Sequence, residues 1–335
     1  MSIPDARAAA SAEARDGARR VLLSTAFAGA GVALLLLLTW RGLAGLEGWD
    51  GSFLDRAANA APKMVLGAFL REFVLNPWFY GVFVVVLLLE RWLPARPQPG
   101  VSRGLRQDLL WAPFEVVMRA TVLPLYLLGL RWVYDTYLAF LTIEGVAAWP
   151  WLARLLLALL ASDLVAWITH VLRHKISALW HFHAVHHSQR DLNFFTEYRV
   201  HPLDQVFAWT LAFVPLFMVD HSFATVLAVV WIRHWHTRLY HSNIRSDFGL
   251  LRYVLVTPQS HRVHHSVELR HRDTNFGLSF SIWDHLFGTQ YRGYDEYPET
   301  GIADPDFPSE HGEHGGGLGG LLEQLLYPFA ALARR

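Results

Sequence analysis

The sequence contains no cysteine, although the chain is 335 residues long. This absence excludes disulfide bonds, thiolate metal sites and cysteine-bound iron–sulfur clusters, so any bound metal must take nitrogen or oxygen ligands. Histidine is missing from the first half: all 18 histidines lie after residue 169, and 16 of them fall between His170 and His285. Such segregation indicates that these histidines share a role.

Charged residues are also scarce, at 17% of the chain against 53% hydrophobic residues, with a formal net charge of zero. This composition is too apolar for a typical soluble protein and favours a protein that lies in a membrane. The chain has no basic blocks interleaved with aromatic residues, so nothing in it indicates a nucleic-acid partner.

Several uncharged runs are long enough to be membrane helices. Val21–Trp40 has 20 residues without a charge, about the length that crosses a hydrocarbon core of roughly 30 Å. We expect an uncleaved spanning helix there rather than a secretory signal, whose apolar core is only about 7 to 15 residues. About six membrane elements are predicted in all; the later ones are Val74–Leu89, Leu109–Leu130 with Glu115 and Arg119 inside it, Trp149–His170, and a hairpin of two runs within Val206–Ile232, broken at Asp220.

The basic residues predict which ends of these helices face the cytoplasm. Short loops rich in Lys and Arg mark that side of a membrane. Arg91, Arg96, Arg103 and Arg106 lie in one such loop, and counting the spans onward places the segment after His170 on the same side. The sequence therefore predicts a multi-pass protein whose histidine-rich segments face the cytoplasm, in the inner membrane if the source is bacterial.

One histidine-rich motif occurs twice, as "HAVHHS" from His183 and as "HRVHHS" from His261. Each copy of the motif has histidines at positions i, i+3 and i+4, which are neighbours on one face of a helix. His170 and His174 have the same four-residue spacing, and His241 adds a donor from a separate segment. Each cluster can therefore aim two or three imidazoles at one point.

Nine histidines are predicted as metal ligands by this spacing: His170, His174, His183, His186, His187, His241, His261, His264 and His265. One ion takes four to six ligands, so nine nitrogens indicate two ions, and imidazole suits iron, zinc, copper and nickel. A structural zinc site needs only four ligands, and the protease spacing HExxH is absent. The competing interpretation is a solvated patch that responds to pH, but packed imidazoles repel one another when protonated, whereas a metal holds them neutral.

The segment from Asp163 to Thr289 resembles the fatty acid hydroxylase and sterol desaturase superfamily of membrane di-iron enzymes. The resemblance lies in "DLVAWITHVLRH", "LWHFHAVHHS", "RVHP", "HSN", "TPQSHRVHHS" and "NFGLSFSIWDHLFGT", in this order. The family commonly has HRxxH at its first histidine box, whereas here Val171 follows His170 and the arginine is displaced to Arg173.

The resemblance implies an all-α fold, a polytopic membrane bundle with a cytoplasmic cap of histidine-bearing helices around two irons. It also implies that O2 and two electrons are used to hydroxylate or desaturate a lipid C–H bond, in a fatty acyl, sterol, carotenoid or alkyl chain. We place the di-iron domain at residues 161–292. A cytoplasmic segment 1–20 and transmembrane helices at 21–160 precede it, and a tail at 293–335 with a Gly-rich linker and a short amphipathic end follows.

Some polar residues are candidates for the surroundings of the metals. Asp163 lies two helical turns before His170 and so on the same face, and a carboxylate within a membrane span is a functional hypothesis by default. Two interpretations are open: Asp163 accepts the outer N–H of a ligand histidine, or it snorkels to the membrane interface. Glu197, Asp204, Asp273 and Asn275 are expected to be solvated or capping groups, and His201 and His236 remain open as further ligands.

Electrons for such chemistry must come from a separate reductase, ferredoxin or cytochrome, because the chain has no cysteines and no flavin or dinucleotide fingerprint. Within the enzyme class, a lipid desaturase and an alkyl-ether monooxygenase remain open alternatives. From another class, the histidines could belong to a membrane protein that binds or transports divalent metals. Transporters place polar groups near the midplane of several spans, whereas these donors crowd one end of the predicted helices.

Overall fold

The computed structural model describes residues 77–220, 223–312 and 316–334. Over these ranges the fold is all-α, with isolated β-bridges and no β-strand, as the sequence predicts. The spanning helix predicted at Val21–Trp40 lies outside the described residues, as do the first three residues of the run predicted at Val74–Leu89.

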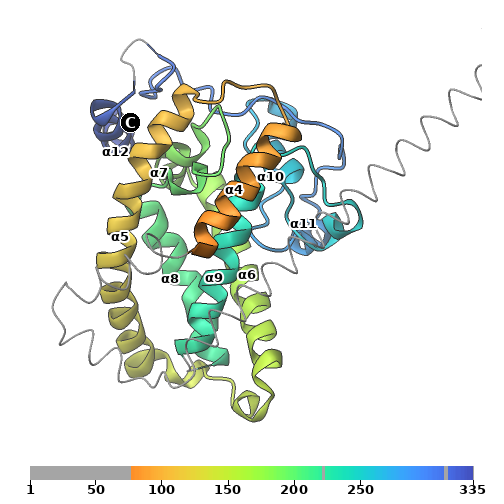
Figure 1. The fold of residues 1–335 in the computed structure, drawn as a ribbon. Helices are drawn as coiled ribbons and strands as arrows, with labels where there is room; N and C mark the ends of the chain where they lie inside the picture. Colours follow the sequence, from red (N-terminus) through yellow and green to blue (C-terminus); the bar gives the residue numbers. More distant parts are fainter. Residues whose placement is uncertain (1–76, 221–222, 313–315, 335) are drawn as a thin grey trace, which may run out of the picture.

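Four of the described α-helices are the long helices of the fold (Figure 1): α5 (Arg103–Val133), α6 (Trp151–Lys175), α8 (Pro202–Val219) and α9 (Phe223–His241). These four and the shorter α4 (Pro77–Trp92) contain the predicted apolar runs. The others follow the apolar runs or connect them: α7 (Ser177–His187), α10 (Pro258–His264), α11 (Ile282–Phe287) and α12 (Leu318–Ala333).

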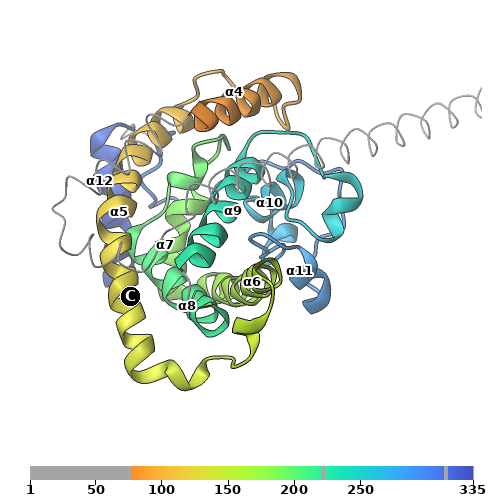
Figure 2. The same ribbon diagram turned by 60° about the horizontal axis from the view of Figure 1, so that its bottom comes forward.

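Helices α5, α6, α8 and α9 run side by side along one direction, with α7, α10 and α12 near one end of them (Figure 1). Figure 2 shows α4 and α5 along the outside of α7, α8 and α9. A cluster of buried apolar side chains, including Leu159, Leu216 and Val229, fills the space between the long helices. Burial of this apolar surface is the main stabilising contribution to the bundle.

The charges that interrupt the apolar runs pair with one another. Glu115 and Arg119 form an ion pair of 2.6 Å within α5, and Arg154 of α6 reaches Asp220 at the end of α8, at 3.2 Å. The break at Asp220 separates α8 from α9, so the predicted hairpin of two helices is present. Pairing allows each charge to lie among apolar neighbours without an isolated buried charge.

Among the described helices, α6 and α8 are long and apolar enough to cross a membrane. The side chains that α6 turns outward are themselves apolar; Leu152 is 70% exposed and Leu156 is 53% exposed. Outward-facing leucines on an apolar helix are typical of a surface that meets lipid rather than water.

Local sequence signals set the short helices that carry histidines. Ile176, with an extended backbone, separates α6 from α7, so that α7 starts in a new direction directly after the last turn of α6. At α10, Thr257 and Ser260 form a reciprocal capping box and Pro258 takes the first helical position. Both features stabilise a helix start, and they fix α10 although it has only seven residues.

The C-terminal helix α12 packs against α5 and α7. The Trp111 indole of α5 donates to Oε1 of the buried Gln324 at 2.8 Å, and Leu321 and Tyr327 join an apolar cluster with Val185 of α7. The opposite face of α12 is exposed and apolar, with Leu322 at 60% and Leu326 at 63%. The amphipathic tail predicted from sequence is therefore a helix docked on the end of the bundle that carries the histidines.

Candidate metal centre

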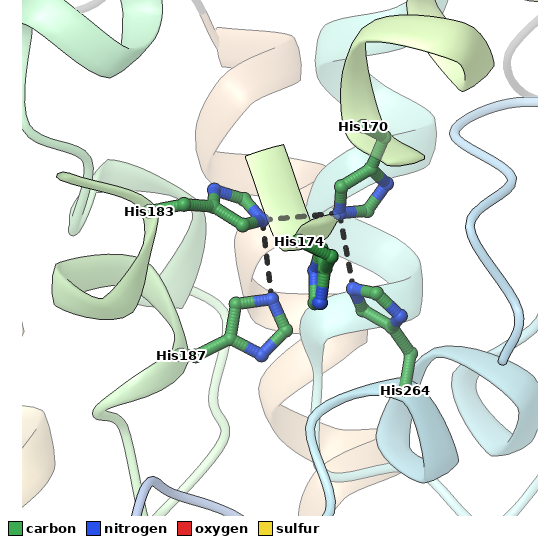
Figure 3. A group of neighbouring side chains, drawn as sticks. All are labelled: His170, His174, His183, His187 and His264. Carbon is green, nitrogen blue, oxygen red and sulfur yellow. Dashed lines mark hydrogen bonds between the residues drawn. The ribbon is translucent and has the colours of Figure 1, made fainter. Parts of the chain in front are cut away.

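The nine predicted histidines converge in two groups. The five-histidine group combines residues from α6, α7 and α10, and one ring nitrogen from each lies within 4.8 Å of the others: His170, His174, His183, His187 and His264. Figure 3 shows these five rings pointing toward a common centre. The four-histidine group combines residues from α7, α9 and α10 within the same limit: His186, His241, His261 and His265.

The two copies of the histidine-rich motif distribute their histidines between the two groups in opposite ways. In α7, the i and i+4 histidines His183 and His187 join the five-histidine group, and His186 at i+3 joins the other. In the second copy of the motif, at α10, His261 and His265 join the four-histidine group and His264 joins the five-histidine group. The same i, i+3, i+4 spacing on two helices therefore supplies both groups, and each copy of the motif contributes histidines to both.

The two groups are adjacent. The ring of His187 stacks on the ring of His265, with centroids 4.2 Å apart and an interplanar angle of 19°. The His183 and His186 rings lie 5.6 Å apart on the same helix. Two ions held by these groups would therefore be close neighbours.

Within each group the Nε2 atoms face one another at short distances. His170 Nε2 lies 3.1 Å from His183 Nε2 and 3.0 Å from His264 Nε2, the dashed contacts of Figure 3. In the four-histidine group, His241 Nε2 lies 3.1 Å from His186 Nε2 and 2.8 Å from His261 Nε2.

The protonation of these rings follows from their outer nitrogens. Backbone carbonyls lie at hydrogen-bond distance from four Nδ1 atoms: His170 to Phe276 O at 2.7 Å, His264 to Thr274 O at 2.8 Å, His241 to Thr237 O at 2.8 Å, and His186 to Arg199 O at 3.1 Å. A carbonyl only accepts, so each Nδ1 carries the proton and donates it. A neutral imidazole has one N–H, so its Nε2 has a bare lone pair.

These rings are neutral at physiological pH. Burial lowers the pKa of His264 to about 4, since the charged form is poorly solvated inside the protein. Facing Nε2 lone pairs at about 3 Å repel one another because no proton lies between them. A cation at the centre of each group removes this repulsion, and the donor set therefore fits a metal ion.

The number of donors also bears on the type of ion. Five nitrogens in one group exceed the four ligands of a closed tetrahedral zinc site. This favours an ion with more than four ligands.

A carboxylate does orient a histidine of the five-histidine group, but it is not Asp163. Asp204, in the first turn of α8, lies with its Oδ2 3.0 Å from His183 Nδ1 and 3.1 Å from the Arg173 guanidinium. Asp204 is 3% exposed, so the expectation that it is solvated or a cap is wrong. Arg173 is the displaced arginine of the first histidine box, and the displacement puts it where it can pair with Asp204.

The hydrogen bond predicted between Asp163 and a ligand histidine is absent, because Asp163 points into a different segment. Its carboxylate accepts the backbone N–H groups of Ser279 and Phe280, at 3.0 and 3.1 Å, and the Trp283 indole at 3.1 Å. His170, on the same face two turns later, donates to Phe276 O instead. Asp163 thus stabilises the loop that supplies the acceptor for His170, one step further from the metal than predicted.

Asp284 stabilises the same loop and was not found from the sequence. Its Oδ1 and Oδ2 accept from the N–H groups of Phe276 and Gly277, at 2.8 and 2.7 Å, and Oδ1 also accepts the Trp167 indole at 2.9 Å. Its position in "WDHLFGT" next to a tight turn at Gly288 is a signal that a carboxylate is used to bind backbone donors.

His201 and His236 join neither group. His201 caps α8, since its Nδ1 accepts from Leu203 N at 3.1 Å and its Nε2 donates to Leu325 O at 3.1 Å. His236 donates through Nε2 to Val256 O at 2.9 Å. Both side chains are therefore used in hydrogen bonds that support the fold.

The remaining predicted capping residues differ in burial. Asp273 is partly exposed and pairs with Lys175 at 2.7 Å. Glu197, by contrast, is 3% exposed and pairs with Arg238 at 2.8 Å, and Asn275 is 3% exposed and donates to Ser260 O at 2.8 Å. Asn275 thereby binds the helix that carries His261 and His264.

A buried ionic cluster lies behind the four-histidine group. The Arg199 side chain is fully buried between two carboxylates, with Asp108 of α5 at 2.7 Å and Glu310 near the C-terminus at 2.9 Å. The carbonyl of Arg199 is the acceptor for His186 Nδ1. Sequence analysis placed Asp108 only at the edge of an apolar run, and nothing in the spacing linked it to Arg199.

One cleft, with a volume of about 430 Å³, reaches the histidines. His174, His187 and His264 of the five-histidine group line it, together with Trp180. The residues that line this cleft include no member of the four-histidine group. Of the nine histidines, those that line this cleft thus all belong to the five-histidine group.

The histidine-bearing region is similar to known proteins. The family model for fatty acid hydroxylases matches residues 155–289. Ornithine lipid hydroxylase OlsE of Rhizobium tropici is 31% identical over 189 residues, which are 56% of this chain and 54% of that protein. Alkylglycerol monooxygenase of Danio rerio is 30% identical over 224 residues, 64% of this chain and 46% of that protein.

The alkylglycerol monooxygenase of Homo sapiens is 25% identical over 244 residues, 69% of this chain and 50% of that protein. The chain thus spans about half the length of these curated relatives. No solved structure matches the chain. The matched segment contains all nine histidines of the two groups, so the histidine-bearing region of this chain is similar to the fatty acid hydroxylase family.

Proposed function

We propose that this chain is a membrane-bound oxidoreductase that hydroxylates a lipid C–H bond with two iron ions, O2 and electrons from a separate protein. The observation that carries the proposal is the pair of adjacent, buried histidine groups whose neutral rings direct bare Nε2 atoms inward. Imidazole donors suit iron, and the relatives named above are a lipid hydroxylase and alkylglycerol monooxygenases.

When bound, the irons would supply the activation of O2 that an unreactive C–H bond requires. The five-histidine group holds one iron and the four-histidine group holds the other. Asp204 accepts the Nδ1 proton of His183, which keeps that ring in the orientation and tautomer that a metal needs. Carbonyl acceptors do the same for His170, His264, His241 and His186.

We further propose that the long helices cross a membrane and that the histidine groups lie at its cytoplasmic side. The apolar outward face of α6 supports the first statement. The basic residues of the connecting segments, Arg96 and Arg103 among them, support the second. A substrate from the bilayer and an electron donor from the cytoplasm would then reach the same end of the bundle.

Cleavage of an alkyl ether is the second candidate, favoured by the similarity to alkylglycerol monooxygenases. Hydroxylation of the carbon next to an ether oxygen gives a hemiacetal, which breaks down to an aldehyde and an alcohol. A desaturase would use the same donors. Metal transport is disfavoured because both groups lie together at one end of the bundle rather than along its helices.

The test is turnover by the iron-loaded protein in lipid nanodiscs, with a surrogate reductase and ¹⁸O2, on acyl lipids and on 1-alkylglycerols. Mass spectrometry separates the outcomes. A lipid that gains one ¹⁸O atom indicates hydroxylation, an aldehyde indicates ether cleavage, and loss of two hydrogens indicates desaturation. Protein with both ions bound that oxidises none of these lipids would contradict the proposal.

A further inference from the structure

The cleft above the five-histidine group has walls made from two loops. Residues 266–269 and 272–273 after α10 form one wall, and residues 301–305 form the other. The loops are fastened together where they leave α10, since Val267 N donates to Glu299 O and Gly301 N donates to His265 O, both at 3.1 Å. The cleft is therefore built onto the helix that carries His264.

The floor of the cleft is aromatic and the histidines form part of it. The Trp180 ring lies 5.0 Å from the His174 ring and 5.3 Å from the His187 ring. Further apolar side chains line the walls, and two of them are exposed: Val267 at 39% and Leu269 at 83%. The volume of about 430 Å³ is within the range of small-molecule sites. An apolar chain segment can therefore lie beside the histidines.

The three carboxylates on the walls are already engaged. Glu268 pairs with Arg270 at 2.7 Å, Asp273 pairs with Lys175 at 2.7 Å, and Asp304 accepts from the Tyr327 hydroxyl. Glu268 and Asp273 are therefore paired with cations, whereas Asp304 has a hydrogen bond from a neutral hydroxyl.

Arg272 is the one Lys or Arg among the residues that line the cleft. It is exposed, and among the described residues no carboxylate lies within ion-pair distance of its guanidinium. Its five N–H donors suit a phosphate or carboxylate group, which they can bind in a bidentate way. The cleft therefore has one guanidinium available for an anionic group.

We propose that this cleft binds the substrate as an anionic amphiphile, with its apolar segment against Trp180 and the histidines and its phosphate or carboxylate group at Arg272. The proposal rests on the function proposed above and specifies its substrate class. It also specifies which group acts on the substrate, because the cleft touches the five-histidine group. Lipid head groups and free phosphate share the anionic chemistry, so the probes must separate them.

The experiment measures binding without O2 or reductant, on the metal-loaded full chain in phosphatidylcholine nanodiscs, with empty nanodiscs subtracted. The probes are dodecyl phosphate, 1-dodecylglycerol and inorganic phosphate. We expect dodecyl phosphate to bind about tenfold more tightly than 1-dodecylglycerol, the effect of one charge-assisted contact at a partly exposed site. Inorganic phosphate should bind at least tenfold more weakly than dodecyl phosphate, because it lacks the apolar segment.

Arg272→Gln should remove the preference for the phosphate amphiphile and leave binding of 1-dodecylglycerol unchanged. Arg292→Gln is the matched control, since Arg292 is an exposed arginine that does not line the cleft, and it should bind as the unaltered chain does. Both positions are on the surface, so folding is preserved.

Equal binding of the charged and neutral amphiphiles, or unchanged binding by Arg272→Gln, would overturn the proposal. Equal binding of dodecyl phosphate and inorganic phosphate would also overturn it, in favour of a site for free phosphate. Failure of lipid oxidation with Arg272-dependent binding intact would instead count against the oxygenase function alone.

Discussion

The two histidine groups both draw on the repeated histidine-rich motif, yet their surroundings differ. The five-histidine group has a carboxylate behind one ring, at Asp204, and a cleft above it. The four-histidine group has no lining residue in that cleft, and a buried arginine between two carboxylates lies behind it. The difference teaches that similar donor sets can be given different surroundings by their neighbours: members of the five-histidine group line the cleft, and no member of the four-histidine group does.

The largest effect should come from removing one ligand of each group. We expect His264→Ala to lose the ion of the five-histidine group and His241→Ala to lose that of the four-histidine group, since each removes a ring whose Nδ1 is fixed by a carbonyl. Turnover should fall by at least about 100-fold in both. Elemental analysis should give about one iron per chain in each variant. Two irons and full turnover in His241→Ala would show that the four-histidine group is not a metal site.

The next largest effect should come from Asp108→Asn, which breaks the buried cluster behind the four-histidine group. Arg199 would keep Glu310 but lose the carboxylate at 2.7 Å. Removing one partner of a buried ion pair costs about 3 kcal/mol of unfolding free energy. Thermal unfolding in detergent measures it, with Asp306→Asn as the control because that carboxylate is 62% exposed. Equal melting temperatures for the two variants would contradict the structural role of Asp108.

Asp204→Asn sharpens the comparison at the five-histidine group. Loss of a carboxylate behind a ligand histidine typically lowers metal affinity about 10- to 100-fold. Competition with a chelator should show this loss for one of the two ions, with partial recovery in Asp204→Glu. Asp163→Asn should change affinity less, because Asp163 binds backbone N–H groups beyond the acceptor of His170. A larger effect of Asp163→Asn would restore the orientation predicted from sequence.

The smallest effect should come from narrowing the cleft. Ala303 is exposed on its wall, so Ala303→Trp should raise KM a few-fold and leave the iron content unchanged. Ala333→Trp, an exposed position at the end of α12, is the matched control and should have no effect. An unchanged KM in Ala303→Trp would place the substrate path elsewhere.

Much of the site could be predicted because its signals are local. The nine histidines follow from i, i+3 and i+4 spacing, and a helix turns that spacing directly into a shared face. Their division into five and four could not be predicted, because it depends on how α7 and α10 lie relative to α6 and α9. The positions of the helices followed from apolar runs in the same local way.

The carboxylates show where local reasoning fails. Asp163 lies on the predicted face of α6, yet its carboxylate oxygens accept hydrogen bonds from the loop at 279–283 and not from a histidine. Asp204 follows a helix start at Pro202, which normally indicates a solvated or capping acid, but α7 and Arg173 bury it. Arg199 meets Asp108 and Glu310 from positions about 90 and 110 residues away, and no spacing rule connects them.

The most direct test of the central claim is the metal content of the purified chain, by elemental analysis combined with Mössbauer spectroscopy on protein from cells grown with iron-57. We predict about two irons per chain in a coupled pair, because the two groups are adjacent, with the His187 ring of one stacked on the His265 ring of the other. A single tightly held zinc, with no iron after expression in iron-replete medium and reconstitution, would contradict the account.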